Sequence, residues 1–272
     1  MIRRLSESPQ RVEPRCPVAR QCGGCQLQAL SYEKQLEFKT SKVRGHLERI
    51  GGFTDIPMEK ILGMDQPFHY RNKAQFPVGK SKDGRIITGF YAGRTHSIIE
   101  NRDCALGVTR NKEVLDRVIA HMEKFHIQPY DENTGKGLVR HVLIRYGFFT
   151  DEMMVCLIIN GEKLPGEEAL VKSLRQIPEA VSVMVNVNKK RNNVILGEKV
   201  RLLWGQPYIT DKIGEISYQI SPLSFFQVNP YQTGRLYGKA LEYAQLSGNE
   251  TVWDLYCGIG TISLCLAQKA KM

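Results

Sequence analysis

Three cysteines near the N-terminus stand at spacings that could bind a metal centre. Cys16, Cys22 and Cys25 lie in the segment CPVARQCGGC, whose pattern is C-x5-C-G-G-C. The two glycines between the last two cysteines tolerate positive φ angles, so the backbone could fold tightly around a central object. Three thiolates on one loop need a fourth ligand from elsewhere to complete a tetrahedral or cubane site.

The other cysteines differ in their surroundings, and one of them suits this fourth position. The chain has seven cysteines, an odd number that argues against a disulfide framework where no export signal is present. Cys156 lies in the apolar run MMVCLIIN, which predicts a buried strand and a packed core cysteine. Cys104 follows polar residues in ENRDCALG, just past an expected hairpin. We therefore expect Cys104 to be the fourth ligand.

Four cysteines with one distant member fit either an all-cysteine zinc site or a [4Fe–4S] cluster. Structural zinc sites usually pair two CxxC-like knuckles, whereas here a single knuckle is joined by two separate cysteines, Cys16 and Cys104. This asymmetry favours the iron–sulfur cluster. A redox-active CxxC pair is the third alternative, and it would not need Cys16 or Cys104.

A glycine turn near the C-terminus indicates a second kind of site. Gly258 and Gly260 follow the apolar segment Thr251–Tyr256, an expected strand, and precede an expected helix, as at the start of a nucleotide-binding α/β domain. Ser263 replaces the third glycine of the dinucleotide fingerprint, and an ordinary strand-to-helix turn is the alternative. Asp254 would repel a pyrophosphate but suits a ligand with a cationic amino-acid end, such as S-adenosylmethionine.

The elements between the cysteine loop and the glycine turn predict an α+β unit. Apolar residues recur at helical or alternating spacing, and Ser31 and Gly51 are suited to begin and end the first helix. The expected helices are 31–50, 111–126 and 167–177, and the expected strands are 68–78, 85–99, 138–147, 153–160 and 181–188. Because these elements follow one another closely along the chain, we expect local antiparallel pairing.

The pattern changes near Ser221, where we expect a domain boundary. The expected strand EISYQISP leads into SFFQVNP, and a helix is expected from about Tyr231 to Leu246. The expected organisation is a linker remnant over 1–15, a central α+β domain with an iron–sulfur cluster over 16–220, and the start of an α/β Rossmann-like domain over 221–272.

The charge of the chain favours a polyanionic partner. Lysine and arginine number 38 against 28 acidic residues, so the formal net charge is +10. In FHYRNKAQFPVG, strand alternation places Arg71 and Lys73 on one face, where they could contact an RNA backbone; the alternative is a solvated strand face. With 42% hydrophobic residues, no apolar run of about 18 residues and no signal peptide, we expect a folded cytoplasmic protein without a membrane partner.

Four motifs together resemble the iron–sulfur-containing RNA uracil-5-methyltransferases, which act on 23S ribosomal RNA and, in relatives, on transfer RNA. The motifs are C-x5-C-G-G-C with Cys104 downstream, Y-R-N-K-A-Q-F, F-F-Q-V-N-P and D-L-Y-C-G-I-G-T, and they cover essentially the whole chain. The resemblance implies a [4Fe–4S] cluster on the four cysteines and S-adenosylmethionine contacts from Gln227 and Tyr256, beside Asp254 and the two glycines. It also implies 23S ribosomal RNA as substrate and identifies 221–272 as the beginning of the methyltransferase domain.

The resemblance further implies a covalent mechanism for which this sequence shows no nucleophile. In the family a cysteine thiolate adds to C6 of uracil, C5 takes the methyl group, and a base then removes the C5 proton. Neither Cys257 nor Cys265 lies in the motif of that nucleophile, which we expect beyond Met272. We therefore expect a chain truncated at both ends and inactive alone, with residues 1–15 resembling the exit linker of an RNA-binding β-barrel. The alternatives are a non-catalytic iron–sulfur RNA-binding module and a redox iron–sulfur protein, although the sequence shows no flavin-binding feature.

Overall fold

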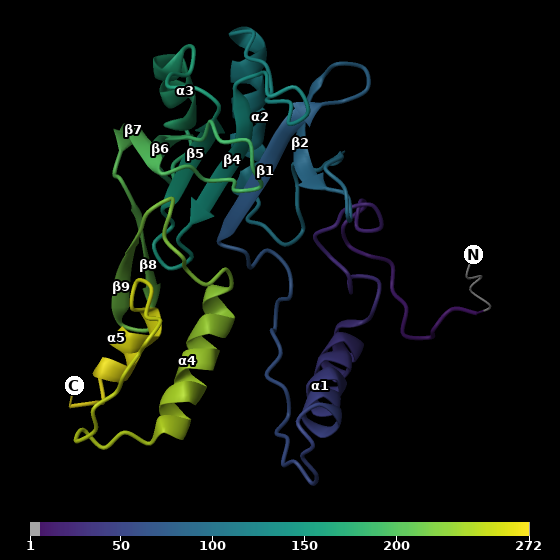
Figure 1. Ribbon diagram of the computed structural model, residues 1–272, viewed down its shortest axis with the longest axis vertical. Coiled ribbons are helices and arrows are strands. Elements are labelled where there is room, and N and C mark those ends of the chain that lie inside the picture. The colour runs from purple at the N-terminus through teal and green to yellow at the C-terminus, as the bar shows by residue number, and fades with distance from the viewer. Residues whose placement is uncertain (1–5, 272) are drawn as a thin grey trace.

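The computed structural model describes residues 6–271, and a seven-stranded mixed sheet forms its centre (Figure 1). The strands lie in the order β3-β2-β1-β4-β5-β6-β7, and every neighbouring pair is antiparallel except β5 and β6. The strands are β1 (Lys73–Lys80), β2 (Ile86–Tyr91), β3 (Ile98–Glu100), β4 (Val139–Tyr146), β5 (Met153–Ile159), β6 (Ala180–Val187) and β7 (Lys199–Gly205). The expected α+β unit is therefore present as a mixed sheet with helices.

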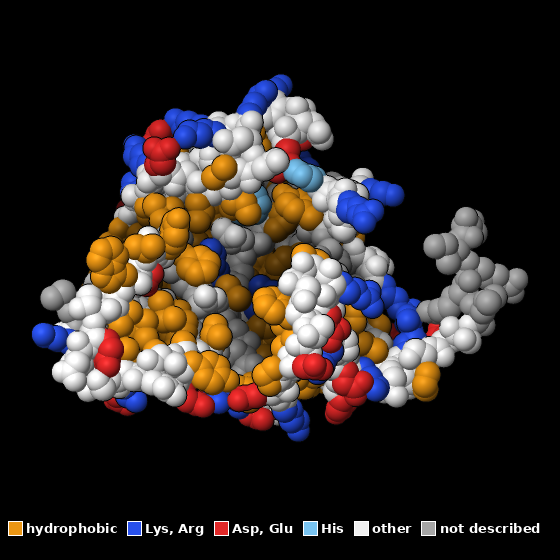
Figure 2. All heavy atoms as spheres, turned by 60° about the horizontal axis from the view of Figure 1, so that its bottom comes forward, with side chains coloured by type: hydrophobic (Ala, Val, Ile, Leu, Met, Phe, Trp, Pro, Cys, Tyr) orange, Lys and Arg blue, Asp and Glu red, His pale blue; other side chains and the backbone are white. Residues whose placement is uncertain are grey.

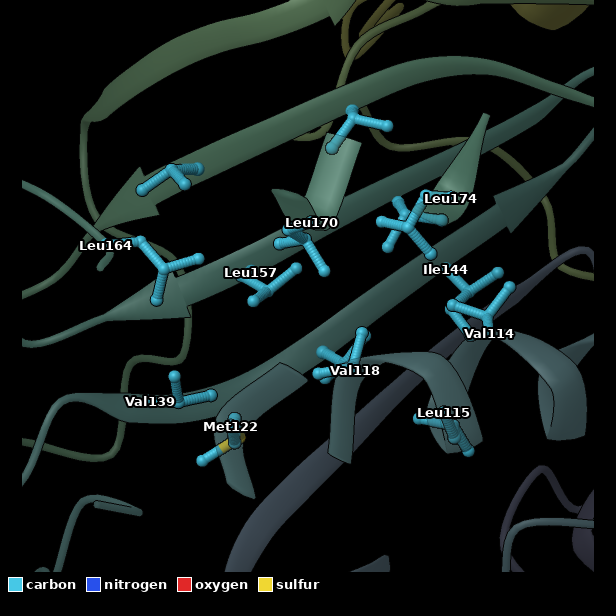
Figure 3. Packing of buried hydrophobic residues seen from close by; sticks show 14 of the residues in the cluster. Val114, Leu115, Val118, Met122, Val139, Ile144, Leu157, Leu164, Leu170 and Leu174 are labelled. Carbon is cyan, nitrogen blue, oxygen red and sulfur yellow. The ribbon is translucent and has the colours of Figure 1, made fainter. Parts of the chain in front are cut away.

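Two helices cover one face of the sheet with apolar side chains. They are α2 (Arg110–Lys124) and α3 (Glu167–Leu174), both at positions that the helical spacing predicts. Figure 3 shows side chains of both helices pointing at the sheet. The labelled residues are Val114, Leu115, Val118 and Met122 of α2, Leu170 and Leu174 of α3, Leu164 before α3, and Val139, Ile144 and Leu157 of the sheet.

The opposite face is covered in part by a two-stranded hairpin and two further helices. These are β8 (Ile209–Ile213), β9 (Ile216–Ile220), α4 (Pro230–Ala244) and α5 (Thr261–Ala267). Phe226, Tyr237 and Cys265 from this layer share a core cluster with Leu143 and Cys156 of the sheet. Cys156 is completely buried, which confirms the prediction of a packed core cysteine.

Three expectations about the strands are wrong. The chain returns from β5 through α3, and a crossover helix makes β6 parallel to β5 rather than antiparallel. The expected strand 85–99 is interrupted after Tyr91 and forms β2 and β3. The expected strand Thr251–Tyr256 has no strand structure, because no described strand lies beside it to pair with its backbone; Tyr256 is 95% exposed.

The expected domain organisation stays a prediction, and residues 1–5 of the expected linker lie outside the described part of the chain. The first helix, α1 (Tyr32–Arg49), has the expected extent, yet none of its residues is buried.

The face that carries α1, α4 and α5 exposes hydrophobic side chains around a central hollow (Figures 1 and 2). No helix within residues 6–271 is long and apolar enough to cross a membrane.

Candidate functional site

The four cysteines predicted as ligands line a single cavity of about 390 Å³ beside the start of β1. They are Cys16, Cys22, Cys25 and Cys104. The segment after Cys104 runs along the approach to β1, because Arg71 N–H donates to the Leu106 carbonyl (2.9 Å) and Arg71 bridges with Gly107. Sequence positions about 80 residues apart are therefore brought to one wall.

The C-G-G-C loop is fixed against the end of β2 by a close backbone approach. Cys22 forms a β-bridge with Ala92, and Gly23 N–H donates to the Tyr91 carbonyl (2.9 Å). A Cβ atom on Gly23 would lie 3.0 Å from that carbonyl oxygen and 3.1 Å from the Gly93 backbone. Neither Gly23 nor Gly24 has a positive φ. The expected reason for these glycines is therefore wrong: Gly23 is needed for a close approach, not for a left-handed backbone.

Hydrogen-bond donors point at the sulfur atoms of the C-G-G-C pair. Gly24 N–H donates to Cys22 Sγ (3.4 Å), within the same turn. Gln28 Nε2 donates to Cys25 Sγ (3.4 Å), from one turn further along the chain. The thiolate is the form of cysteine that binds metals, and both sulfur atoms thus have an N–H donor nearby.

The two separate cysteines have donors as well. Asn101 Nδ2 donates to Cys16 Sγ (3.7 Å), which links the N-terminal loop to the end of β3. The backbone N–H groups of Leu106 and Gly107 donate to the thiol group of Cys104, and they offset part of the rise in its pKa that burial causes. Each of the four sulfur atoms thus accepts at least one N–H group.

Burial and mutual repulsion oppose these donors. Burial raises the pKa of both Cys25 and Cys104, and the neighbouring cysteines raise it further through like-charge repulsion. No group of three His, Cys, Asp or Glu side chains within residues 6–271 is placed to hold a single metal ion. A zinc ion would need its sulfur ligands at about 2.3 Å from one point. The cysteines surround a cavity rather than such a point.

The predicted basic strand contributes cations to the same cavity. Arg71, Lys73 and Gln75 all line it, as expected from the alternation along β1. Lys73 lies directly opposite Arg145 of β4. Burial, and then the charge of Arg145, lower the pKa of Lys73 to about 8. Lys73 is still largely charged at neutral pH, so the cavity joins thiol groups to two cationic side chains.

Two buried polar side chains hold the SFFQVNP loop on the sheet. Asn72 N–H donates to the Val228 carbonyl (3.1 Å), and Asn72 Nδ2 donates to the Gln227 carbonyl (2.8 Å). Arg145, which is 2% exposed, donates through Nη2 to the carbonyls of Pro222 (3.3 Å) and Ser224. The backbone around Gln227 is therefore fixed by groups from β1 and β4.

The glycine turn has the backbone that the sequence predicts. Gly258 and Gly260 have φ angles of 57° and 77°, in the left-handed region that favours glycine. Thr261, the next residue, is anchored by two buried tyrosines: Tyr218 OH donates to its carbonyl (2.9 Å), and Tyr237 OH lies 2.8 Å from its Oγ1.

Asp254 is oriented by the residue that replaces the third glycine of the dinucleotide fingerprint. Ser263 Oγ donates to Asp254 Oδ2 (2.6 Å), and Tyr256 N–H donates to Oδ1 (3.2 Å). Asp254 and Ser263 line a small cavity of about 200 Å³. Gln227 lies elsewhere, on the loop before α4. The structure thus gathers the turn residues around Asp254 and holds Gln227 separately.

Comparison with known proteins finds relatives over essentially the whole of this chain. No protein-family model matches the chain. The chain is 49% identical to an uncharacterized RNA methyltransferase of Halalkalibacterium halodurans, over all of this chain and 59% of that protein. An uncharacterized RNA methyltransferase of Bacillus cereus (strain ATCC 10987) is also 49% identical, over 98% of this chain and 58% of its own length. The chain is thus similar to proteins named as RNA methyltransferases, over part of their length.

A solved structure also matches this chain in fold. The tRNA (uracil-54, C5)-methyltransferase of Pyrococcus abyssi, in complex with S-adenosyl-L-homocysteine, matches 97% of this chain with a TM-score of 0.75 and 29% identity. The match covers 58% of that protein. This chain therefore spans about three fifths of the length of the relatives that it matches.

Sequence reasoning missed the residues that support the sites. Arg145 lies in an expected strand, LVRHVLIRYG, where a cation among apolar residues is the only available signal. Strand alternation puts Asn72 on the face away from Arg71 and Lys73, and its hydrogen bond to a loop 155 residues away leaves no local sequence pattern. Gln28 and Asn101 become sulfur donors only once the chain has folded.

Replacing Arg145 should loosen the SFFQVNP loop selectively. Arg145→Met keeps the length of the side chain but leaves two carbonyls without their donor, at a cost of about 1–3 kcal/mol. We expect hydrogen exchange of the Ser221 and Ser224 amides to accelerate about 5- to 150-fold. Arg140→Met is the matched control, because Arg140 is also buried on β4 and donates to carbonyls of Asn188 and Lys190. Equal exchange in both variants would contradict this role.

Proposed function

We propose that the chain is part of an enzyme that transfers a methyl group from S-adenosylmethionine to C5 of uridine in RNA, with 23S ribosomal RNA as the substrate. The observation that carries this proposal is the left-handed glycine turn with the oriented carboxylate of Asp254. It occurs in a chain that matches, over 97% of its length, an enzyme crystallised with S-adenosyl-L-homocysteine. The preference for 23S ribosomal RNA over transfer RNA rests on the four sequence motifs.

The proposed cofactor contacts follow from the chemistry of the turn. Asp254 suits the cationic amino-acid end of S-adenosylmethionine, because opposite charges attract and no phosphate is present. A Cβ on Gly258 would meet nothing within 4 Å, so there is open space for a ligand against the backbone. Tyr256 offers an exposed aromatic face, and the Gln227 amide offers a donor and an acceptor.

The proposed reaction needs a thiolate and a base. The thiolate adds to C6 of uracil, C5 then takes the methyl group from the sulfonium of S-adenosylmethionine, the base removes the C5 proton, and the thiolate leaves C6. Of the two cysteines near the turn, Cys265 is buried and Cys257 is exposed. We propose that the nucleophile lies outside these residues in the whole protein. Methyl transfer by the 272-residue chain alone would contradict this and would point to Cys257.

A methyl-transfer assay with the product of the complete gene tests the function. Labelled S-adenosylmethionine and an unmodified 23S transcript should give label at C5 of uridine, with an unmodified tRNA transcript run in parallel. Asp254→Asn should weaken cofactor binding about 10- to 100-fold, since a charge-assisted contact is lost. Asp116→Asn on α2 is the control. Label in the tRNA transcript alone would exclude 23S ribosomal RNA as the substrate. Binding of RNA without binding of S-adenosylmethionine would favour a non-catalytic RNA-binding module.

We also propose that Cys16, Cys22, Cys25 and Cys104 hold a [4Fe–4S] cluster. Support comes from the shared cavity, from the N–H donor that each sulfur accepts, and from burial that disfavours free thiolates. Hydrogen bonds to ligating sulfurs are characteristic of such clusters. When bound, the cluster would join the N-terminal loop to the segment after β3. Its proposed contribution is to folding rather than to methyl transfer.

Metal analysis of the chain purified without oxygen tests the cluster. We expect a brown protein with about four irons per chain. Cys104→Ser should lose the iron and lower thermal stability, because one ligand and the link to β1 disappear. Cys156→Ser is the control and should keep the iron, since Cys156 is buried within β5. Stoichiometric zinc without iron would instead support the zinc alternative.

Arg71 and Lys73 are proposed contacts to the RNA backbone. Replacing both with alanine should weaken binding to an rRNA fragment and reduce the salt dependence by about 0.7–0.9 per lost phosphate contact. Lys212→Ala, an exposed lysine on β8, should change neither quantity. Titrations by fluorescence anisotropy at several salt concentrations measure both. If the double alanine variant binds the RNA at low salt as tightly as the parent chain does, Arg71 and Lys73 do not contact the RNA.

A further inference from the structure

A second, larger cavity lies beside the cysteine cavity and is not used by the proposed methyl transfer. Its volume is about 960 Å³, and it lies between the β1–β2 hairpin and the loop 128–137. Tyr91 and His141 line both cavities and form the wall between them. We call this cavity the hairpin groove.

An aromatic platform stands in the hairpin groove. The rings of Tyr91 and His96 are stacked, with centroids 5.2 Å apart and an interplanar angle of 23°. Glu132 orients both rings, because it accepts from Tyr91 OH (3.4 Å) and pairs with His96 Nδ1. The His96 side chain is 63% exposed, so the ring face away from Tyr91 is open to a ligand.

Within residues 6–271 the lysines of the groove form no ion pair, whereas its carboxylates accept hydrogen bonds from neighbouring side chains or backbone groups. Lys80, Lys82 and Lys136 line the groove and are exposed, and none forms an ion pair with a carboxylate in the described part of the chain. Asp131 accepts from Asn133 N–H (2.9 Å) and Thr134 Oγ1 (3.1 Å).

The other two carboxylates of the groove are similarly engaged. Glu132 holds the aromatic platform, and Glu100 pairs with Arg102 (3.0 Å) on the side of β3. Lys80, Lys82, Lys136 and Arg140 outnumber the three carboxylates of the groove, and Glu100 is paired with Arg102, so the net charge beside the open aromatic face is positive.

We propose that the hairpin groove binds a single-stranded segment of RNA, with one base stacked on His96 and the adjacent phosphates on Lys80, Lys82 and Lys136. This inference rests on the proposed action on RNA and adds a contact surface separate from Arg71 and Lys73. Stacking on His96 requires an unpaired base, whereas a duplex presents only its backbone.

The test compares groove variants of the 272-residue chain for binding of a labelled, uridine-rich RNA single strand by fluorescence anisotropy. His96→Ala should weaken binding about 5- to 150-fold, as loss of one stacked base predicts, without changing the salt dependence. His96→Phe should retain affinity, because it restores a stacking ring. The triple variant Lys80→Ala, Lys82→Ala, Lys136→Ala should weaken binding and reduce the salt slope by about 2.

A matched control removes the same charge elsewhere. Lys39, Lys42 and Lys212 are exposed and form no ion pair with a carboxylate within residues 6–271, and their triple alanine variant should bind like the parent chain. Parent-like binding by the groove variants, together with weaker binding by Arg71→Ala and Lys73→Ala, would overturn the groove and leave the proposed function intact. If the parent chain binds no RNA, the groove fails, whereas the methyl-transfer assay with the product of the complete gene decides the proposed RNA substrate. Equal binding of an RNA duplex would exclude stacking on His96.

Discussion

Burial of β5 on both faces is the constraint on which the rest of this structure depends. All seven residues of Met153–Ile159 are buried, and their side chains alternate between two different hydrophobic clusters. One cluster is completed by α2 and α3, and the other by the β8–β9 hairpin with α4 and α5. A strand that is apolar at every position cannot face water on either side, so both layers are required. The second layer also carries the glycine turn, which is thereby held against the sheet.

The second face of the sheet is apolar over β5, whereas β1 and β4 add polar side chains to it beside the cysteine cavity. Lys73 lies opposite Arg145, and His141 lies further along β4, opposite Pro77. Arg145 is accommodated because it donates to loop carbonyls, although Nε has no partner. An apolar layer cannot cover such a strip. The N-terminal loop lies over it instead, and its sulfur atoms accept hydrogen bonds from backbone and amide groups.

The sequence predicts local elements well and nonlocal ones poorly. Helical spacing gives α2, because its buried residues depend only on the period of the chain. The parallel pairing of β5 with β6 depends on where α3 returns the chain, which no local pattern records. The segment Thr251–Tyr256 has a strand pattern without a neighbour to pair with, and it does not form a strand. Cys104 could be proposed from its polar surroundings, but the donors to its sulfur could not.

The proposed RNA and cofactor regions are coupled through one residue, because Asn72 lies between the two cations of the basic strand. Arg71 and Lys73 face the cysteine cavity, while Asn72 holds the carbonyls of Gln227 and Val228 through two hydrogen bonds. One of these bonds is a backbone contact, so it persists whatever side chain stands at position 72. Each bond contributes about 1 kcal/mol, too little to fix the loop alone, but Arg145 holds the preceding turn as well. A displacement of the basic strand would therefore move the Gln227 loop as well. RNA bound at the proposed contacts Arg71 and Lys73 would thus be linked mechanically to the proposed cofactor contact Gln227.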